Sequence, residues 1–419
     1  VTVQVSGYAP VSAVMTVDLP DEALYFAVAP GYGTNSFSVT LTGVLNKERY
    51  IDNSWLLPQY KCDGLVKTDK NGTPEWLSSA IISEANVSVF GTFYDMLPLL
   101  DHCAETGINA LWLTPINDKG VNGNGYSNMG INTIDPYLTG ILSYDEEWRQ
   151  LTDTEYEKGW KVFAEFIAEA HKRNIRILFD VVSFGALKES PLITEHPEWF
   201  KSYSQEVTCR DFDWSNSELA EYYVESLTEI AQKTGIDGLR FDSEPQTAGY
   251  EIDGRIRQSI LASGRKLIYI AETKNNDNTV YDLSEGDVQG PDYISVKHFE
   301  SVFLKNNIVD SVKSGDWIGA PEAQDIHKSG EFRYYTFQLC CHDSYEYGAR
   351  GNRLVMGYEA LFSPFIPVWV IGEEMNNDKD GDYTRILYLN TLKRYDLREP
   401  EKRAYYEDVK KMIEIRRKY

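Results

Sequence analysis

The feature that most constrains the fold is an alternation of short apolar runs and amphipathic segments, which begins near residue 79 and continues to the end of the chain. The apolar runs have the length and residue types of buried strands. They cover residues 80–90, 110–113, 175–182, 238–242, 267–272, 293–299, 335–341 and 368–371. Helices are expected at residues 93–105, 160–173, 219–233 and 404–417. Strands that alternate with helices predict a parallel α/β fold, and eight strands favour a closed (β/α)8 TIM barrel over an open sheet.

Residues 1–76 follow a different pattern. Short β-type runs separated by Pro, Gly, Asn and Asp fill residues 1–45, and they are too few for an independent sandwich, so we expect them to pack on the next domain. Residues 46–76 are polar and contain turn signals, which is typical of a connector. The sequence therefore predicts an N-terminal β-rich segment with a connector at residues 1–76 and a barrel at residues 77–419.

Composition excludes several classes of function. The chain of 419 residues has a formal net charge of −23 and a pI of about 4.7, so nucleic acid and anionic membranes are poor partners. No apolar run approaches the roughly 20 residues that a membrane span needs. The five Cys residues show no CxxC spacing, so neither a zinc site nor a disulfide framework is indicated. The sequence lacks an initiator Met and a signal-peptide pattern, so we expect a processed chain. Its compartment stays open, with the extracellular space or cell envelope favoured over the cytoplasm.

Charged and polar side chains stand at the C-terminal ends of the predicted strands, where barrel enzymes carry their catalytic groups. They are Asp180, Arg240, Asp242, Glu272, His342 and Asp343. In residues 238–242, apolar residues alternate with Arg240 and Asp242, so one face of the strand carries a cation beside an anion. A buried ion pair, a helix N-cap or a turn would explain any one of these residues. Their repetition on four strands favours one catalytic site.

Four short motifs that contain these residues resemble, in order, the four motif regions of the α-amylase superfamily, glycoside hydrolase family 13. They are ILFDVV (177–182), GLRFD (238–242), IAET (270–273) and CCHD (340–343). Three further stretches resemble the same family: GINALWLTPI (107–116), GYSNMGINTIDPYLTG (125–140) and FSPFIPVWVIGEE (362–374). The resemblance covers about residues 79–419 and implies a TIM-barrel glycosidase.

The resemblance assigns roles to the carboxyl groups. Glycoside cleavage with retention needs one carboxyl group that protonates the leaving oxygen and a second that attacks the anomeric carbon, roughly 5–5.5 Å apart. The resemblance implies that Asp242 is the nucleophile and that Glu272 is the general acid/base, with a raised pKa. Arg240 would keep Asp242 ionised, and Asp343 would bind sugar hydroxyls and stabilise the transition state.

The resemblance also implies substrate contacts. His342 would hydrogen-bond the sugar ring, and Tyr126 would form an aromatic platform under it, although an ordinary loop tyrosine is the alternative. Asp180, in the first motif, is expected among the substrate-binding residues. Phe184 stands where the family has a sugar-binding His, so it either lines the subsite or packs under the following loop.

Other departures from the family also limit what can be carried over. Ser183 replaces an Asn that often binds calcium in the family, so we expect no calcium at that position. The Asp-rich stretch NNDKDGD (376–382) is expected to be a solvated turn and not a metal loop. Pro245 and Gln246 replace a Lys-His pair, which implies different acceptor contacts. The insertion after the third strand, at about residues 183–216, is short.

The sequence thus predicts a retaining α-glycoside hydrolase with no cofactor. Its substrate would be an α-linked glucan or oligosaccharide of the starch, glycogen or maltooligosaccharide type, cleaved through a covalent glycosyl-enzyme intermediate. A content of 28 Tyr and 9 Trp suits sugar stacking, although a large core could also use it. Two alternatives stay open: a transglycosylase of the same superfamily, and a non-catalytic carbohydrate-binding or scaffold protein with the same fold.

Overall fold

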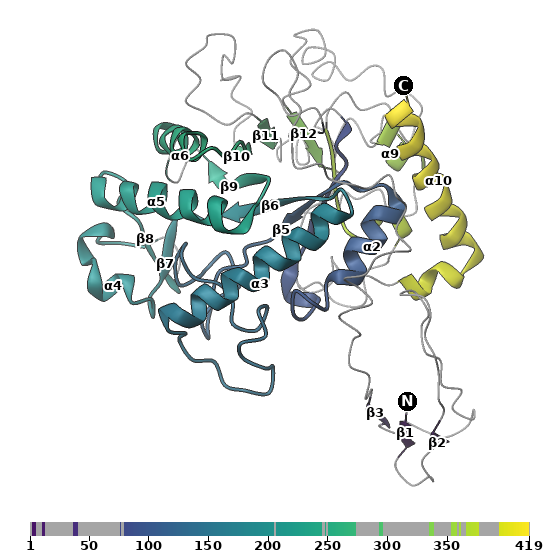
Figure 1. The fold of residues 1–419 in the computed structure, drawn as a ribbon, viewed down its shortest axis with the longest axis horizontal. Coiled ribbons are helices and arrows are strands. Elements are labelled where there is room, and N and C mark those ends of the chain that lie inside the picture. The colour runs from purple at the N-terminus through teal and green to yellow at the C-terminus, as the bar shows by residue number, and fades with distance from the viewer. Residues whose placement is uncertain are drawn as a thin grey trace.

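The computed structural model describes most of residues 79–273, several separate segments of residues 293–418 and three short N-terminal strands (Figure 1). The described residues are 2–5, 11–12, 37–40, 76, 79–204, 207–244, 248, 250–273, 293–295, 335–338, 353–357, 360–361, 366–376 and 394–418. In this part of the chain, no helix has the length and apolar character to cross a membrane.

Eight parallel strands close into a barrel (Figure 1). In order around the ring they are β4 (Ile82–Ala85), β5 (Ala110–Leu113), β6 (Arg176–Val181), β9 (Gly238–Glu244), β10 (Ile268–Thr273), β11 (Tyr293–Ser295), β12 (Tyr335–Gln338) and β13 (Ile366–Val370). Each strand overlaps one of the apolar runs in the sequence. The prediction of a TIM barrel is therefore confirmed.

Side chains alternate between the two faces of each barrel strand, as the strand period of two requires. On β9, Leu239 and Phe241 are fully buried in the core cluster that the strands share with the surrounding helices. Arg240 and Asp242 point the opposite way, into the barrel, where they meet charged residues of β6 and β10. The alternation that is visible in the sequence thus separates the packing face from the polar face.

An apolar cluster fills the barrel interior beside these charged residues. It comprises Ala80, Ile82, Ala110, Trp112, Leu178, Ile268, Ile270, Ile366 and Val368. Gly238, at the start of β9, lacks a side chain because its neighbours occupy the space. A Cβ atom there would lie 2.5 Å from Cγ1 of Ile268 and 2.7 Å from Cδ2 of Leu178. The glycine therefore lets β9 sit in register between β6 and β10.

The helices begin and end at recognisable caps. α3 (Asp153–Lys172) begins at a capping box formed by Thr152 and Glu155. It starts earlier than the expected residue 160, because its first turns are polar and the apolar periodicity begins only at Trp160. α5 (Ser217–Thr234) is capped by Asn216 and ends at Gly235, whose φ of 82° favours glycine.

The sequence-based assignment missed the long helix α6 (Tyr250–Ala262). Its buried residues Ile252, Ile256 and Ile260 recur every four positions, which is the helical signal that could have found it. The first and last described barrel helices, α2 (Leu97–Thr106) and α10 (Pro400–Lys418), overlap the predicted helices.

Short elements make up the insertion and the N-terminal segment. Residues 183–216 contain an antiparallel pair, β7 (Gly185–Leu187) and β8 (Cys209–Asp211), with α4 (Leu192–Glu195) and η3 (Pro197–Trp199) between them. Near the N-terminus, β1 (Thr2–Val5) pairs antiparallel with β2 (Val11–Ser12) and β3 (Phe37–Thr40). The predicted connector lies outside the described residues except for Trp76, so the domain division stays a prediction.

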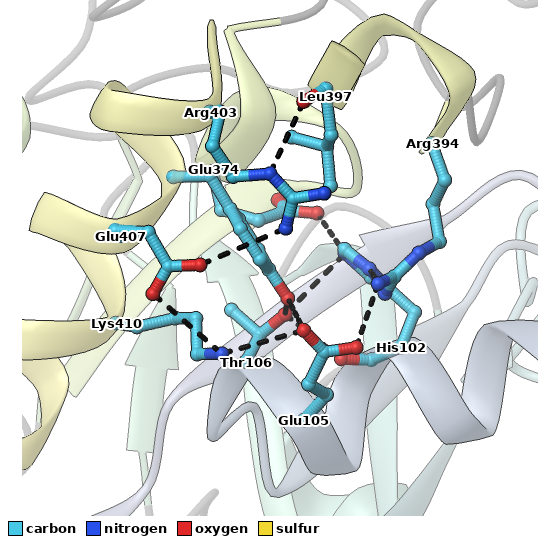
Figure 2. Close-up of polar contacts among 10 residues, drawn as sticks. His102, Glu105, Thr106, Glu374, Arg394, Leu397, Arg403, Glu407 and Lys410 are labelled. Carbon is cyan, nitrogen blue, oxygen red and sulfur yellow. Dashed lines mark hydrogen bonds and ion pairs between the residues drawn. The ribbon is translucent and has the colours of Figure 1, made fainter. Parts of the chain in front are cut away.

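The barrel ring closes where β13 pairs with β4, which joins the last strand to the first. A group of polar side chains, the seam cluster, lies outside this junction between α2, α10, η9 (Glu373–Met375) and η10 (Arg394–Arg398) (Figure 2). Its members are His102, Glu105, Thr106, Glu374, Arg394, Tyr406 and Lys410.

Hydrogen bonds hold the imidazole of His102 from both sides (Figure 2). Nη1 of Arg394 lies 2.6 Å from Nδ1, and Oε1 of Glu374 lies 2.5 Å from Nε2. Because a guanidinium can only donate, Nδ1 accepts and the ring proton sits on Nε2, which donates to Glu374. The seam cluster thus fixes one tautomer of a buried histidine and links the first barrel helix to the last barrel strand.

Candidate active site

Arg240 lies between three carboxyl groups inside the barrel. Its Nη1 donates to Oδ1 of Asp180 at 2.9 Å and to Oδ1 of Asp242 at 2.6 Å. Its Nη2 donates to Oε2 of Glu272 at 2.7 Å. One guanidinium therefore brings together acidic residues from β6, β9 and β10. The structure places four of the predicted site residues in a single network.

The strand register explains this convergence. β9 pairs with β6 on one side, where Asp180 is opposite Arg240, and with β10 on the other side. Asp242 follows Arg240 by two residues and so points to the same face. Glu272 stands near the C-terminal end of β10. The carboxyl groups thus gather at the C-terminal ends of neighbouring strands, which is where barrel enzymes build their sites.

The network is almost closed to solvent. Asp180 is fully buried, Glu272 and Arg240 are 2% and 3% exposed, and Asp242 is 8% exposed. One cation faces three acids, so full ionisation would leave excess negative charge in a buried space. Burial, together with the charges of Glu272 and Asp180, raises the pKa of Asp242 to about 7 although Arg240 lowers it. A buried acid at this position can therefore hold a proton near neutral pH.

Glu272 raises the pKa of Asp242 both by its charge and as a hydrogen-bond partner of the protonated acid. Two ionised carboxylates have only acceptors, so such a bond requires one proton shared by the pair. The pair therefore contains one acid and one base in contact, with Arg240 bridging both of them. This is the arrangement from which one group can donate a proton while the other attacks.

Asp180 has two further donors. The indole Nε1 of Trp112 and the hydroxyl of Tyr126 each lie 2.9 Å from its Oδ2. Burial raises the pKa of Asp180, and Arg240 followed by these two donors lowers it. Burial and the charge of Asp180 raise the pKa of Tyr126 well above its ordinary value, so its hydroxyl keeps its proton. The described contacts of Tyr126 are those of a donor, and its role as a sugar platform stays a prediction.

Sequence reasoning missed Trp112. It belongs to the stretch ALWL, where Ala110 and Trp112 share the inward face of β5. Its ring lies 4.5 Å from Cζ of Arg240. Within the apolar run ALWL, the sequence alone does not distinguish Trp112 from a core residue.

The loop after β5, which carries Tyr126, is held by buried polar side chains. Asp118 accepts from the backbone N of Gly120, Nε1 of Trp148 and the hydroxyl of Tyr156, each at 2.9 Å. Burial raises the pKa of Asp118, and these three donors lower it. These hydrogen bonds hold the loop in place, although it has no regular structure.

The structure places one further predicted site residue, Phe184, apart from the network around Arg240. Phe184 is partly buried and packs against Met129, Leu187 and Cys209. This is the kind of contact expected if Phe184 packs under the following loop. A role in the substrate subsite stays a prediction. His342 and Asp343 lie outside the described residues.

The expectation that no calcium binds at the family's usual position also stays a prediction. Ser183, at the family's calcium position, is buried, and its carbonyl accepts from the indole of Trp214 at 2.8 Å. Among the residues that the structure describes, no group of three or more His, Cys, Asp or Glu side chains could hold a metal ion. The Asp-rich stretch 376–382 lies outside them except for Asn376.

A closed parallel barrel with buried carboxyl groups at its C-terminal strand ends defines the class of a (β/α)8-barrel protein with an enzyme-type site. No family model matches the sequence. A cyclomaltodextrinase from a Bacillus species is 20% identical over 296 residues, which are 68% of this chain and 47% of that protein. The chain therefore spans about half the length of this curated relative.

Solved structures show the same fold. A maltogenic α-amylase from Thermotoga neapolitana superposes with a TM-score of 0.58 and 20% identity, over 80% of this chain and 77% of that one. A debranching enzyme from Nostoc punctiforme superposes with a TM-score of 0.61 and 17% identity, over 85% and 83%. The curated relative and these structures together support a relationship to the α-amylase family.

Proposed function

We propose that this chain is a retaining α-glycoside hydrolase that acts on α-linked glucans or oligosaccharides. The observation that carries the proposal is the bridge that Arg240 forms between Asp242, at 2.6 Å, and Glu272, at 2.7 Å. Inversion needs roughly 6.5–9.5 Å between its two carboxyl groups to admit a water, whereas retention needs about 5–5.5 Å. One guanidinium binds both carboxyl groups, so they lie close together, and this supports retention.

The mechanism follows from the shared proton. A sugar that enters the site would separate the two carboxyl groups, and the proton would stay with Glu272 while Arg240 stabilises ionised Asp242. Glu272 would then protonate the glycosidic oxygen as Asp242 attacks the anomeric carbon, which gives a glycosyl-enzyme ester and a free alcohol. In the second step Glu272, now ionised, would take a proton from water as that water attacks the ester.

The substrate class draws its support from the relatives. The names of the cyclomaltodextrinase, the maltogenic α-amylase and the debranching enzyme all refer to α-glucan chemistry. Hydrolysis is favoured over transglycosylation, which shares the covalent intermediate and differs only in the acceptor. Asp343 as transition-state stabiliser, with His342 and Tyr126 as sugar contacts, completes the proposed site.

The roles of the insertion and of the N-terminal segment are also proposed from the similarity to these relatives. Residues 183–216 would be the family's protruding domain in a reduced form, and the N-terminal β-rich segment would pack on the barrel. A non-catalytic carbohydrate-binding protein is the rival function. The shared proton favours catalysis, because a binding site gains nothing from placing two acids in contact in a buried space.

Turnover on maltooligosaccharides and on an aryl α-glucoside tests the proposal. Glu272→Gln and Asp242→Asn should each lose at least about a hundredfold in kcat, which is the low end for general acid–base catalysis. Glu225→Gln, on the exposed side of α5, is the matched control and should retain full activity. A fluorinated glycosyl donor should label Asp242, as read by mass spectrometry. Sugar binding without turnover by the wild-type protein would favour the rival.

A further inference from the structure

Trp112 contacts both members of the Asp180–Arg240 ion pair. Its Nε1 donates to Oδ2 of Asp180 at 2.9 Å, and its ring lies 4.5 Å from Cζ of Arg240. The side chain is buried in the barrel interior. An aliphatic side chain would make neither contact, so this indole is placed to act on the ion pair.

Oδ2 of Asp180 is the point where these interactions meet. It accepts from Trp112, from the hydroxyl of Tyr126 at 2.9 Å and from Nη1 of Arg240 at 3.2 Å. Two neutral donors thus share the negative charge of Asp180 with the guanidinium. Without either donor, Asp180 would depend more strongly on Arg240 for its stabilisation.

Arg240 is also the cation that faces the Asp242–Glu272 pair. Its Nη1 lies closer to Oδ1 of Asp242, at 2.6 Å, than to either oxygen of Asp180. Nη1 of Arg240 donates to both acids, so a movement of the guanidinium toward Asp180 would weaken its hydrogen bond to Asp242. The described titratable groups around the pair are Arg240 on β9, Asp180 on β6, Tyr126 in the loop after β5, and Glu84 on β4, whose charge acts on Tyr126.

We propose that Trp112 is a positioning residue: by donating to Asp180 and covering Arg240, it keeps the guanidinium turned toward the Asp242–Glu272 pair and so sets the pH at which the pair loses its shared proton. The proposal rests on the proposed function for its catalytic meaning, but the protonation of the pair can be measured without turnover. The sign follows from electrostatics, since a cation near a carboxyl pair favours its ionised form. When Arg240 is drawn toward Asp180, the pair should hold its proton to higher pH.

Infrared difference spectroscopy during a pH titration tests this directly, because a protonated carboxyl group has its own carbonyl stretch. Asp242→Asn assigns the band to the pair. In Trp112→Phe, which keeps an aromatic ring but lacks the N–H, we expect the midpoint to rise by roughly half a pH unit to one unit. Trp160→Phe is the matched control, since this buried indole donates to the carbonyl of Asn132 in the outer core. Its midpoint should equal that of the wild type.

Activity supplies a second readout. The alkaline limb of kcat/KM on maltooligosaccharides should move upward in Trp112→Phe together with the infrared midpoint. If Trp112→Phe does not fold, Tyr126→Phe removes the other neutral donor to the same oxygen and should raise the infrared midpoint in the same direction. An unchanged midpoint in folded Trp112→Phe would overturn the proposal, whatever the activity. A raised midpoint in a protein that hydrolyses no glucan would uphold the positioning role and refute the proposed function instead.

Discussion

Oε1 of Glu374 lies 2.5 Å from Nε2 of His102, although 272 positions separate the two residues in the chain. The other bonds of Glu374 leave its carboxylate fully engaged: it accepts from the backbone N of Gly372 and from Nε1 of Trp369 at 3.1 Å. The fold thus joins the turn after the last barrel strand to the first barrel helix through one buried acceptor.

Glu374→Gln tests this junction. An amide replaces one acceptor oxygen with a donor, so it cannot receive all of these bonds, and a buried donor is left unpaired. We expect a loss of about 1.5–3 kcal/mol in the free energy of unfolding, measured by urea denaturation. Glu407→Gln, an exposed change on α10, should lose less than about 1 kcal/mol. Equal losses in the two variants would contradict the prediction.

Glu105 in the seam cluster predicts a pH effect on stability. Burial raises its pKa, but Arg394 and Lys410 outweigh burial and hold it below the ordinary value of 4.5. A lowered folded-state pKa stabilises the fold above the unfolded value, and this stability is lost as pH falls through the folded value. Glu105→Gln should therefore lower Tm at neutral pH, and its Tm should converge with that of the wild type below about pH 4.5. Parallel Tm profiles would exclude this role.

The buried ion pair of Arg173 and Asp101 predicts a large core effect. Nε of Arg173 lies 2.6 Å from Oδ1 of Asp101, and burial raises the pKa of Asp101 to about 6 although Arg173 lowers it. Arg173→Met leaves the acid without its cation, which costs about 3–5 kcal/mol for a buried pair. The loss in the free energy of unfolding should be larger at pH 8 than at pH 5, because at pH 5 Asp101 takes up a proton and no longer carries a buried charge. A loss independent of pH would show that packing dominates.

The shared proton of Asp242 and Glu272 predicts the alkaline limb of activity. The raised pKa of Asp242, about 7, means that the pair keeps its proton below this pH and loses it above. A fully ionised pair has no acid for the leaving group, so kcat/KM on maltooligosaccharides should fall as pH rises through about 7. An aryl α-glucoside with a good leaving group needs less protonation and should show a weaker fall. The same profile for both substrates would count against Glu272 as the acid.

Phe184→His separates packing from substrate binding. The ring packs on Met129, Leu187 and Cys209, so an imidazole there should lower the free energy of unfolding by about 1–3 kcal/mol, as for a buried polar group without a partner. Kinetics on plain glucosides should be unchanged. A changed kcat/KM with unaltered thermal stability would place the ring in the subsite.

Much of the barrel could be predicted from the sequence because each strand is a local pattern. Residues 238–242 show the inward and outward faces of β9 directly. The early start of α3 was missed because its first turn is defined by Thr152 and Glu155, which carry no apolar periodicity. The seam cluster could not be predicted, since it depends on pairs such as His102 and Glu374 that only barrel closure brings together.

The candidate site also contains some features that the sequence could predict and others that it could not. Four site residues could be found because each lies at the end of an apolar run: Asp180, Arg240, Asp242 and Glu272. The register of the neighbouring strands then brings their side chains together. Trp112 could not be distinguished from core, because its hydrogen bond to Asp180 has no signature in the sequence. The shared proton depends on burial and on the contact between two side chains, neither of which a motif contains.

Gly238 has a consequence for anyone who would alter the specificity of this barrel by randomising β9. The space where its side chain would be is occupied by Ile268 and Leu178, so even a methyl group would force these side chains or β9 itself to shift. A shift of β9 would also displace Arg240, two residues further along the strand, and Asp242. A combinatorial library that samples this position would thus lose most of its members before selection begins, and fixing the glycine in advance would leave its diversity for positions that can use it.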